Sequence, residues 1–502
     1  MRSKNVLLNI FSNLVLQMII VIYGFVVPKV IIQYFGSNVN GLVASITQFL
    51  AYIVLLESGV GPVVKSILYK PISKKDNTTI EKILKSSEQF FRTISYIFLV
   101  YIAILCFVYP LLVSNNFGKF YTISLIIIIG MSTFAEYFFG MTYRLLIQAD
   151  QKNYIVSIIQ IVTYILCIFC VLIMSYLSFD VHFIKFVTGV IFVMRPLFQN
   201  YYVKKHYNID LKNVSEKYEI KQKWDGLAQH VAYVIHTNTD ITILTLFTSL
   251  TEVSVYSIYY LVIKGLKAII QSFITGIDSI FGDMLAKNEQ KNLCKKFNLY
   301  EIIYNMINVI IFSSALVLIV PFVSIYTKNI VDADYIRPTF AALLVISEYI
   351  WGIRQPYNEL VKASGHFKET KAGAWIECGS NIVVSILLVR KYGLIGVAIG
   401  TIFAMTIRTI EFIYHTNKYI LCRSVLESIK KVLIVIIETL IIVIICKYLP
   451  FLKNTNYFNL IINAIMVLIV ASIITIIVNC LLFKKELNGF ISNIVKALRK
   501  KL

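Results

Sequence analysis

The strongest constraint on the fold of this chain is a succession of apolar segments along nearly its whole length. A segment of about 20 mostly apolar residues can cross the hydrocarbon core of a bilayer, and by that measure the sequence holds about fourteen of them. They lie at 8–32, 40–62, 90–113, 121–145, 155–177, 181–203, 228–248, 254–278, 298–326, 336–360, 371–389, 394–418, 431–449 and 458–483. Because the bilayer core offers no water to backbone groups, segments of this length are expected to be helices. With 58% hydrophobic residues and a mean hydropathy of +0.75, the sequence predicts an all-α polytopic membrane protein.

Parts of the sequence repeat at a nearly constant offset. The pattern Tyr-x-x-Leu-x-x-Ala at 143–149 returns at 357–363, and Gly-x-Ile-Phe-x-Met at 189–194 returns at 400–405. These matches indicate two related halves of six helices each, followed by an extra helix pair. Internal repeats in a membrane chain are typical of transporters that bind substrate at the repeat interface.

The repeat predicts the organisation of the chain. We expect an N-terminal six-helix lobe at 1–205, a cytoplasmic linker at 206–227 and a C-terminal six-helix lobe at 228–420. The residues 421–502 are expected to hold helices 13 and 14 and a basic cytoplasmic tail. The tail has the composition of an amphipathic segment at the membrane surface, although a frayed basic end fits its residues equally well.

Lysine and arginine are concentrated in the termini and in alternate connections between the segments. By the positive-inside rule, both termini and the loops at 63–89, 204–227 and 284–297 are predicted to lie in the cytoplasm. The net charge of +21 follows from this bias and favours contact with anionic membrane lipids. Because the basic residues are spread over many short loops, we expect no nucleic-acid partner.

The sequence lacks the motifs of several enzyme classes. It holds no G-x-x-x-x-G-K-[ST] phosphate loop, so ATP hydrolysis is not expected. The predicted outer connections are too short for the catalytic loop of a membrane glycosyltransferase or polymerase. Cys167-x-x-Cys170 lies within an apolar segment without a second pair or a nearby histidine, which argues against a metal or redox site. We therefore expect no enzymatic activity, no cofactor and no metal.

The segment at 254–278 carries a polar stripe whose members recur every three or four residues and therefore share one helical face. The stripe consists of Ser257, Tyr260, Lys264, Lys267, Gln271, Thr275 and Asp278. At 1.5 Å per residue, Lys264 is expected about 15 Å from the outer end of the helix, near the middle of a core about 30 Å thick. A charge at that depth is costly unless it faces water or a partner. We favour a cavity-lining role for both lysines over ion pairs with acids on neighbouring helices.

The preceding segment has polar residues at its centre, among them His236 and Asp240. Asp240 is a candidate counter-charge to Lys264, a cation site or a proton carrier, and its surroundings in the sequence do not choose among these roles. His236 is interpreted as a helix-interface group rather than a proton relay. In the first half, Pro28 stands at the position of Asp240 and Tyr52 at that of Lys264, so the halves share a scaffold but not a charge pattern.

Four further charges lie deep in the predicted spans. They are Arg195 and Arg408, at similar depths in the two halves, and the carboxylates Glu136 and Glu348. A transport role and a buried salt bridge fit each of them equally well. Charges nearer the span ends are expected to act as anchors at the membrane surface; they are Lys29, Arg92, Arg144, Lys185, Arg337 and Lys447.

A run of helix-breaking residues interrupts the second span near its cytoplasmic end. It contains Glu57, Gly59, Gly61 and Pro62. Glycine and proline at this place favour a bend or an unwound turn that is useful for gating. An ordinary helix end is the alternative interpretation.

Several short motifs carry a resemblance to a known family. They are Gln33-Tyr34-Phe35-Gly36, Asn40-Gly41-Leu42, Glu57-x-Gly59-Val60-Gly61 with Lys65, Asn238-Thr239-Asp240, and Val255-Tyr256-Ser257. With these motifs and its layout of six, six and two helices, the chain resembles the O-antigen and capsular polysaccharide flippases. That family belongs to the multidrug/oligosaccharidyl-lipid/polysaccharide exporter (MOP) superfamily.

The resemblance implies two six-helix lobes around a central cavity that opens alternately to the cytoplasm and to the outside. It implies a lipid-linked oligosaccharide as substrate, with a pyrophosphate held by Lys264 and Lys267 and a polyprenyl tail cradled by helices 13 and 14. Tyr260, Gln271 and the two deep arginines, Arg195 and Arg408, complete the expected substrate site. Membrane lipids and a polysaccharide polymerase machinery are the other expected partners, and a bacterial plasma membrane is the expected location.

Two other functions remain open at this point. A flippase for peptidoglycan lipid precursors would use the same cavity chemistry. A cation-coupled multidrug antiporter of the same superfamily would instead bind its coupling ion and its drug at Asp240 and Glu348, with His236 and Glu136 as further candidates for ion coupling.

Overall fold

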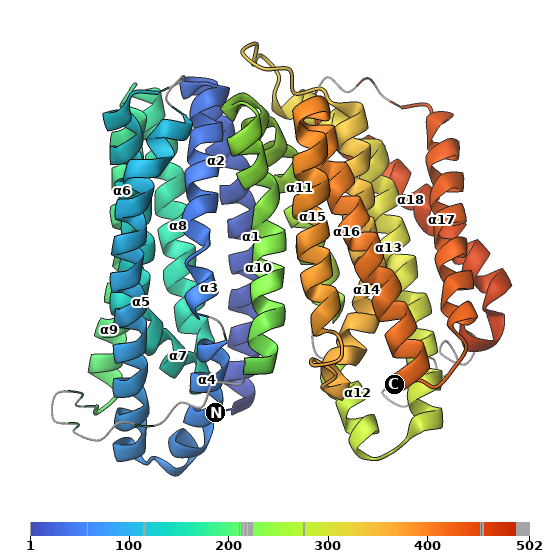
Figure 1. Cartoon of the computed structure of the whole chain (residues 1–502), viewed down its shortest axis with the longest axis horizontal. Coiled ribbons are helices and arrows are strands. Elements are labelled where there is room, and N and C mark those ends of the chain that lie inside the picture. Colours follow the sequence, from blue (N-terminus) through green and yellow to red (C-terminus); the bar gives the residue numbers. More distant parts are fainter. Residues whose placement is uncertain are drawn as a thin grey trace. The chain divides into compact units, whose positions relative to one another are not determined.

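The structure is a computed structural model. It describes residues 2–57, 59–113, 117–209, 211, 214, 218, 224–274, 277–451, 453 and 456–487. These residues form helices joined by short connections, without a strand among them (Figure 1). In chain order the helices are α1 (Arg2–Phe35), α2 (Ser37–Ala51), α3 (Val54–Glu57), α4 (Val60–Lys74), α5 (Asn77–Leu112), α6 (Lys119–Ala135), η1 (Glu136–Gly140), α7 (Met141–Ala149), α8 (Asn153–Tyr176), α9 (Val181–His206), α10 (Trp224–Phe247), α11 (Leu250–Ile274), α12 (Ile277–Ala286), α13 (Gln290–Tyr326), α14 (Pro338–Ser364), α15 (Lys371–Tyr392), α16 (Leu394–His415), η2 (Thr416–Ile420), α17 (Val425–Lys447) and α18 (Tyr457–Leu482). The segments η1 and η2 are single turns of π-helix.

Among the described residues, 11 helices are long and apolar enough to cross a membrane. The other three predicted spans are helical as well, as α10, α14 and α17. Polar residues interrupt their apolar runs, among them Asp240 in α10, Glu348 in α14 and Lys431 in α17. The predicted all-α polytopic membrane fold is therefore confirmed.

Contacts divide the chain into two compact units, Met1–Ser257 (unit 1) and Ile258–Leu502 (unit 2). The division falls within α11. The lobe boundaries inferred from the repeat remain a prediction, because the contacts group α10 and the start of α11 with unit 1. Much of the predicted linker at 206–227 and the predicted tail beyond Leu487 lie outside the described residues.

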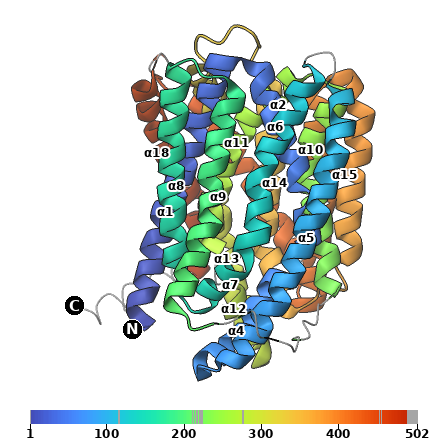
Figure 2. The same ribbon diagram turned by 90° about the vertical axis from the view of Figure 1, so that its left-hand side faces the viewer.

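In unit 1, α8 contacts both α1 and α9, and α6 contacts both α9 and α5 (Figure 2). Large apolar side chains fill the space between α2, α4, α5, α6 and α7, among them the fully buried Phe91 and Phe98. The long helix α5 begins at Asp76, whose carboxylate accepts hydrogen bonds from the Thr79 hydroxyl (2.6 Å), the Thr78 hydroxyl (2.7 Å) and the Thr79 amide (3.1 Å). These bonds satisfy an amide at the helix end and lower the pKa of the Asp76 carboxyl to about 2.

A row of uncharged hydrogen bonds joins α2 to α10 and to the start of α11 within unit 1. The pairs are Asn40–Ser254 (2.8 Å), Ser45–Thr245 (2.7 Å), Gln48–Asn238 and Tyr52–Thr242 (3.0 Å). Hydrogen bonds between side chains of neighbouring helices stabilise membrane bundles, by about 0.6 kcal/mol each on average. This row explains why α10 packs with the first half of the chain although the repeat assigns it to the second.

In unit 2, α13 contacts α14, α17 and α18, while α16 packs against both α14 and α15. The core at one end of this bundle is formed by α12, α13, α14 and α16 and includes the buried side chains of Phe281, Phe297, Leu360 and Phe412. The final pair, α17 and α18, is therefore attached to the bundle mainly through α13.

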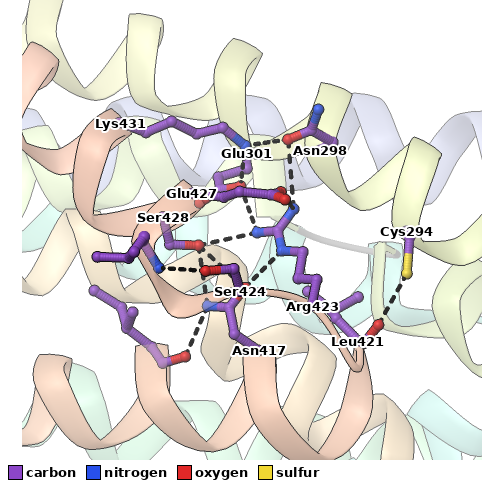
Figure 3. A network of polar contacts seen from close by, with 12 residues as sticks. Cys294, Asn298, Glu301, Asn417, Leu421, Arg423, Ser424, Glu427, Ser428 and Lys431 are labelled. Carbon is purple, nitrogen blue, oxygen red and sulfur yellow. Dashed lines mark hydrogen bonds and ion pairs between the residues drawn. The ribbon is translucent and has the colours of Figure 1, made fainter.

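A buried polar network fixes the beginning of α17 against α13 (Figure 3). The Glu301 carboxylate is fully buried and accepts hydrogen bonds from Arg423 (2.9 Å) and Lys431 (2.5 Å), and also from the Tyr357 hydroxyl. Arg423 donates in addition to the side chain of Asn417 in η2 (2.5 Å). One carboxylate thus pairs with cations from two segments and ties α13, α14, η2 and α17 together.

We expect Glu301→Ala to lower the free energy of unfolding by about 3–5 kcal/mol, because Arg423 and Lys431 would then be buried without their carboxylate. Glu427→Ala is the matched control. It removes a carboxylate that is 57% exposed and 3.9 Å from Arg423, and it is expected to cost less than about 1 kcal/mol. Denaturant titration of the detergent-solubilised protein measures both values, and equal losses would show that Glu301 does not hold the network together.

Candidate functional site

The two lysines predicted at the centre of the site lie in unit 2, on the part of α11 that follows the unit boundary. Lys267 is mostly buried, and its ammonium lies 2.7 Å from the Glu348 carboxylate of α14. The same ammonium lies 4.4 Å from the centre of the Trp351 ring. Both contacts stabilise the positive charge, by ion pairing and by attraction to the aromatic face.

Lys264 has different surroundings. Its side chain is exposed, and its ammonium lies 5.1 Å from the centre of the Tyr260 ring, one turn earlier on α11. Within the part of the chain that the structure describes, no carboxylate forms an ion pair with it. The adjacent Gly265 borders open space, since a methyl group placed there would meet no atom within 4 Å. Of the two roles weighed for the lysines, Lys267 thus forms an ion pair and Lys264 keeps an uncompensated charge.

The structure therefore brings together Tyr260, Lys264, Lys267 and Glu348 from the predicted site. Gln271 follows one turn further along α11 and is exposed. Trp351 belongs to the same cluster but was not predicted. Its position three residues after Glu348 places the two on one helical face, which is the signal that identifies it.

Asp240 and His236 lie in unit 1, and both are buried. The Asp240 carboxylate accepts a hydrogen bond of 2.8 Å from the Tyr256 hydroxyl at the start of α11. This contact holds the carboxylate inside unit 1, and the role of Asp240 in ion coupling stays a prediction.

The two deep arginines have unlike partners. In unit 1 the guanidinium of Arg195 lies 4.2 Å from the ring centres of both Tyr164 and Phe192, and its Nε donates to the Thr163 hydroxyl (2.7 Å). Arg408 in unit 2 is only 4% exposed. It forms an ion pair with Glu411 (2.5 Å), a looser contact with Glu377 (3.6 Å) and a hydrogen bond to the Thr370 carbonyl (2.7 Å). Arg408 thus has the geometry of a buried salt bridge, whereas Arg195 has the geometry of a cation held by aromatic rings.

The predicted gating segment is interrupted in the structure. The backbone of Gly59 is left-handed, with φ at 80°, between α3 and α4, and Pro62 lies in the first turn of α4, where no amide is needed. The Glu57 carboxylate accepts a hydrogen bond from the Tyr137 hydroxyl (3.1 Å) in η1. Gly61 follows at the start of α4. A gating role for these residues stays a prediction.

Glu136, at the start of η1, forms an ion pair of 3.1 Å with Arg144 in the next helix, and both side chains are partly exposed.

In the described residues, no group of three or more histidine, cysteine, aspartate or glutamate side chains is arranged to hold a metal ion.

Two apolar cavities border the last two helices of unit 2. The larger, about 470 Å³, lies between α14, α16 and α17, with Ile353, Ile410 and Leu433 among its lining residues. The other, about 310 Å³, lies between α11, α13 and α18, where Leu266 and Leu468 face it. Their linings are almost wholly hydrocarbon, so they suit alkyl or prenyl chains rather than polar ligands.

The described residues thus form a multi-pass helical bundle with charged groups deep in its spans. Comparison with solved structures shows that the fold is similar to those of several membrane transport proteins. The structure of the lipid II flippase MurJ in an inward closed conformation has a TM-score of 0.69 and 16% identity, over 95% of this chain and 100% of that one.

Two further structures share the fold. An inward-facing multidrug resistance transporter of the MATE family has a TM-score of 0.63 and 15% identity, over 81% of this chain and 97% of that one. A MOP superfamily transporter from Pyrococcus furiosus, described as having a binding pocket of reverse polarity, has a TM-score of 0.53 and 12% identity over 82% and 94% of the two chains. No protein-family model matches the sequence, and no curated protein sequence matches it.

The two lysines of α11 are expected to differ in their effect on stability. Glu348→Gln should lower the free energy of unfolding by about 3 kcal/mol because it leaves Lys267 without its counter-charge. The double variant Lys267→Gln/Glu348→Gln should recover most of that loss, since it removes both charges. Lys264→Gln should change stability by less than about 0.5 kcal/mol. Unfolding of the four proteins in detergent measures these values, and a double variant no more stable than Glu348→Gln would argue against the pair.

Proposed function

We propose that this chain is a flippase that moves polyprenyl-pyrophosphate-linked oligosaccharide units from the cytoplasmic to the outer leaflet of a bacterial plasma membrane, for the synthesis of a surface polysaccharide. The observation that carries the proposal is the uncompensated ammonium of Lys264 beside the ion pair of Lys267 and Glu348. The fold shared with a lipid II flippase supports the same class of substrate.

In this proposal Lys264 binds the pyrophosphate. An ammonium without a carboxylate partner is free to donate charge-assisted hydrogen bonds to an anionic ligand, and such bonds are stronger than neutral hydrogen bonds. Lys267 acts mainly through Glu348 and Trp351, because its charge is already compensated and its position fixed. Tyr260 and Gln271 offer an aromatic and a polar surface to the sugars, whereas Trp351 is buried against Lys267.

The apolar cavity between α14, α16 and α17 is proposed to receive the polyprenyl tail. Its lining keeps the tail in hydrocarbon surroundings while the polar part of the substrate crosses. The Glu301 network supports this role because it fixes the start of α17, which forms one wall of the cavity.

The remaining predicted residues enter the proposal in other roles. Asp240, His236 and Glu136 are candidates for coupling transport to an ion, and the segment from Glu57 to Pro62 for gating by alternating access. Arg195 and Arg408 contact the substrate only after a change in their present contacts. Both termini are proposed to lie in the cytoplasm, and a polysaccharide polymerase machinery is the proposed partner that receives the product.

Two alternatives stay within the same fold. A flippase for peptidoglycan lipid precursors is favoured by the likeness to a lipid II flippase, and Lys264 would bind the same pyrophosphate. A cation-coupled multidrug antiporter is favoured by the MATE structures. It fits the site less well, because the Glu348 carboxylate that would bind a drug cation is already paired with Lys267.

Translocation of a fluorescent polyprenyl-pyrophosphate oligosaccharide in proteoliposomes tests the proposal. Lys264→Gln is expected to lower the translocation rate at least about tenfold, because a charge-assisted contact is worth about 1.5–3 kcal/mol. Lys287→Gln, on an exposed lysine paired with Asp283, is the matched control and should leave the rate unchanged.

Each outcome points to one function. No translocation of the lipid by the wild-type protein, together with export of a cationic drug, would establish the antiporter instead. Translocation of lipid II but not of other lipid-linked oligosaccharides would establish the peptidoglycan alternative. An unchanged rate in Lys264→Gln would remove Lys264 from the substrate site.

A further inference from the structure

Unit 1 contains a cavity whose lining includes one charged side chain. It has a volume of about 340 Å³ and is bordered by α1, α2, α3, α6, η1 and α9. Lys185 of α9 is the one charged residue among those that line it. Hydroxyl groups of Thr47, Ser132 and Thr188 border the same space, and the Phe192 ring forms part of its wall.

Lys185 was expected to anchor α9 at the membrane surface, because it lies near the end of a span. The structure instead places it on the face of α9 that carries Thr188, Gly189 and Phe192, at steps of three and four residues. A side chain at Gly189 would approach Met131 of α6 to 3.0 Å. Its absence lets α9 lie close to α6 beside the cavity that Lys185 lines.

The charge of Lys185 has no acidic partner among the residues that the structure describes. The phenol groups of Tyr23 and Tyr137 line the same cavity. Lys185 is partly exposed. An ammonium that is partly removed from water and has no counter-charge is still costly, since apolar side chains do not replace its hydration. Its retention is explained if an anion occupies the cavity during the working cycle.

The hydroxyl groups of the lining present acceptors to this space. Thr47 donates its hydrogen to the Val43 carbonyl (2.7 Å), and Ser132 donates to the Ile129 carbonyl (3.3 Å). Thr188 likewise donates to the backbone carbonyl of Lys185 (3.0 Å). Because each hydrogen is used within its own helix, the oxygens offer lone pairs to donors of a ligand. The lining therefore combines one strong donor for an anion with acceptors for hydroxyl groups.

We propose that this cavity binds an acidic sugar, with its carboxylate on the Lys185 ammonium and its hydroxyl groups donating to Thr47, Ser132 and Thr188. The volume is at the lower end of that of ligand pockets, which range from about 300 to 1,000 Å³, and far above the space that one ion or water requires. This inference rests on the proposed function, because the acidic sugar would be part of the lipid-linked oligosaccharide.

Isothermal titration of the full-length protein in detergent with sodium glucuronate, glucose and sodium chloride tests the site. We expect glucuronate to bind at least about tenfold more tightly than glucose. Lys185→Gln should weaken glucuronate binding at least about tenfold, which corresponds to about 1.4 kcal/mol. Lys185→Arg should retain binding because it keeps the charge. Lys119→Gln, on an exposed lysine at the start of α6, is the matched control and should bind as the wild type does.

Stability supplies a second readout. Without ligand, Lys185→Gln should unfold at the same or a higher denaturant concentration than the wild type, because it removes an uncompensated charge. A loss of stability would identify Lys185 as a structural residue and overturn the proposal. Equal binding of glucuronate to the wild type and Lys185→Gln, equal binding of glucose and glucuronate, or binding of chloride alone would overturn it as well.

The translocation assay separates this inference from the proposed function. If glucuronate binding depends on Lys185 but no lipid-linked oligosaccharide is translocated, the acidic-sugar site stands and the flippase proposal fails. If lipids with acidic and with neutral sugars are translocated at equal rates by the wild type and by Lys185→Gln, the flippase proposal stands and the acidic-sugar site fails.

Discussion

The cost of placing a charge in hydrocarbon governs the interior of this molecule. Lipid offers charged groups no hydration, so each of them needs a partner within the protein or an aqueous space. Glu301 and Glu427 together pair with Arg423 and Lys431, and Glu348 pairs with Lys267. These pairs position helices and leave no charge for a ligand. Against that background, the ammonium groups that have no carboxylate partner among the described residues are the best indicators of ligand binding, because the fold alone does not explain them.

The two units satisfy their polar groups by different means. Between α2 and α10, unit 1 uses neutral hydroxyl and amide groups, such as the Ser45–Thr245 pair. Unit 2 relies on ion pairs between α11 and α14, between α13 and α17, and among α14, α15 and α16, the last through Arg354 and Glu377. The internal repeat thus predicts a common helical scaffold, whereas the chemistry that distinguishes the halves lies where their residues differ.

Periodicity in the sequence predicted the helices correctly, because they depend on residues close together in the chain. It did not predict which acid pairs with Lys267, since Glu348 lies on another helix and the packing of α11 against α14 is set by contacts distant in sequence. Lys185 shows the same limit. Its place near the end of a span predicts an anchor at the membrane surface, and this stays a prediction, whereas its position beside a cavity depends on how α9 packs against α6. The depth of a side chain in a span follows from counting residues along the helix, whereas the direction in which it points follows from how the helices pack.

The strengths of these contacts also suggest which helices are fixed. A hydrogen bond between neutral side chains of membrane helices contributes about 0.6 kcal/mol on average, partly because its groups find other partners when separated. Breaking a buried ion pair by removing one partner costs about 3–5 kcal/mol. The row between α2 and α10 can therefore be exchanged for water at small cost wherever water enters unit 1. The ion pairs of the Glu301 network cannot be exchanged for water at small cost. We therefore expect α17 and the apolar cavity beside it to keep their place against α13 while other parts of the protein move.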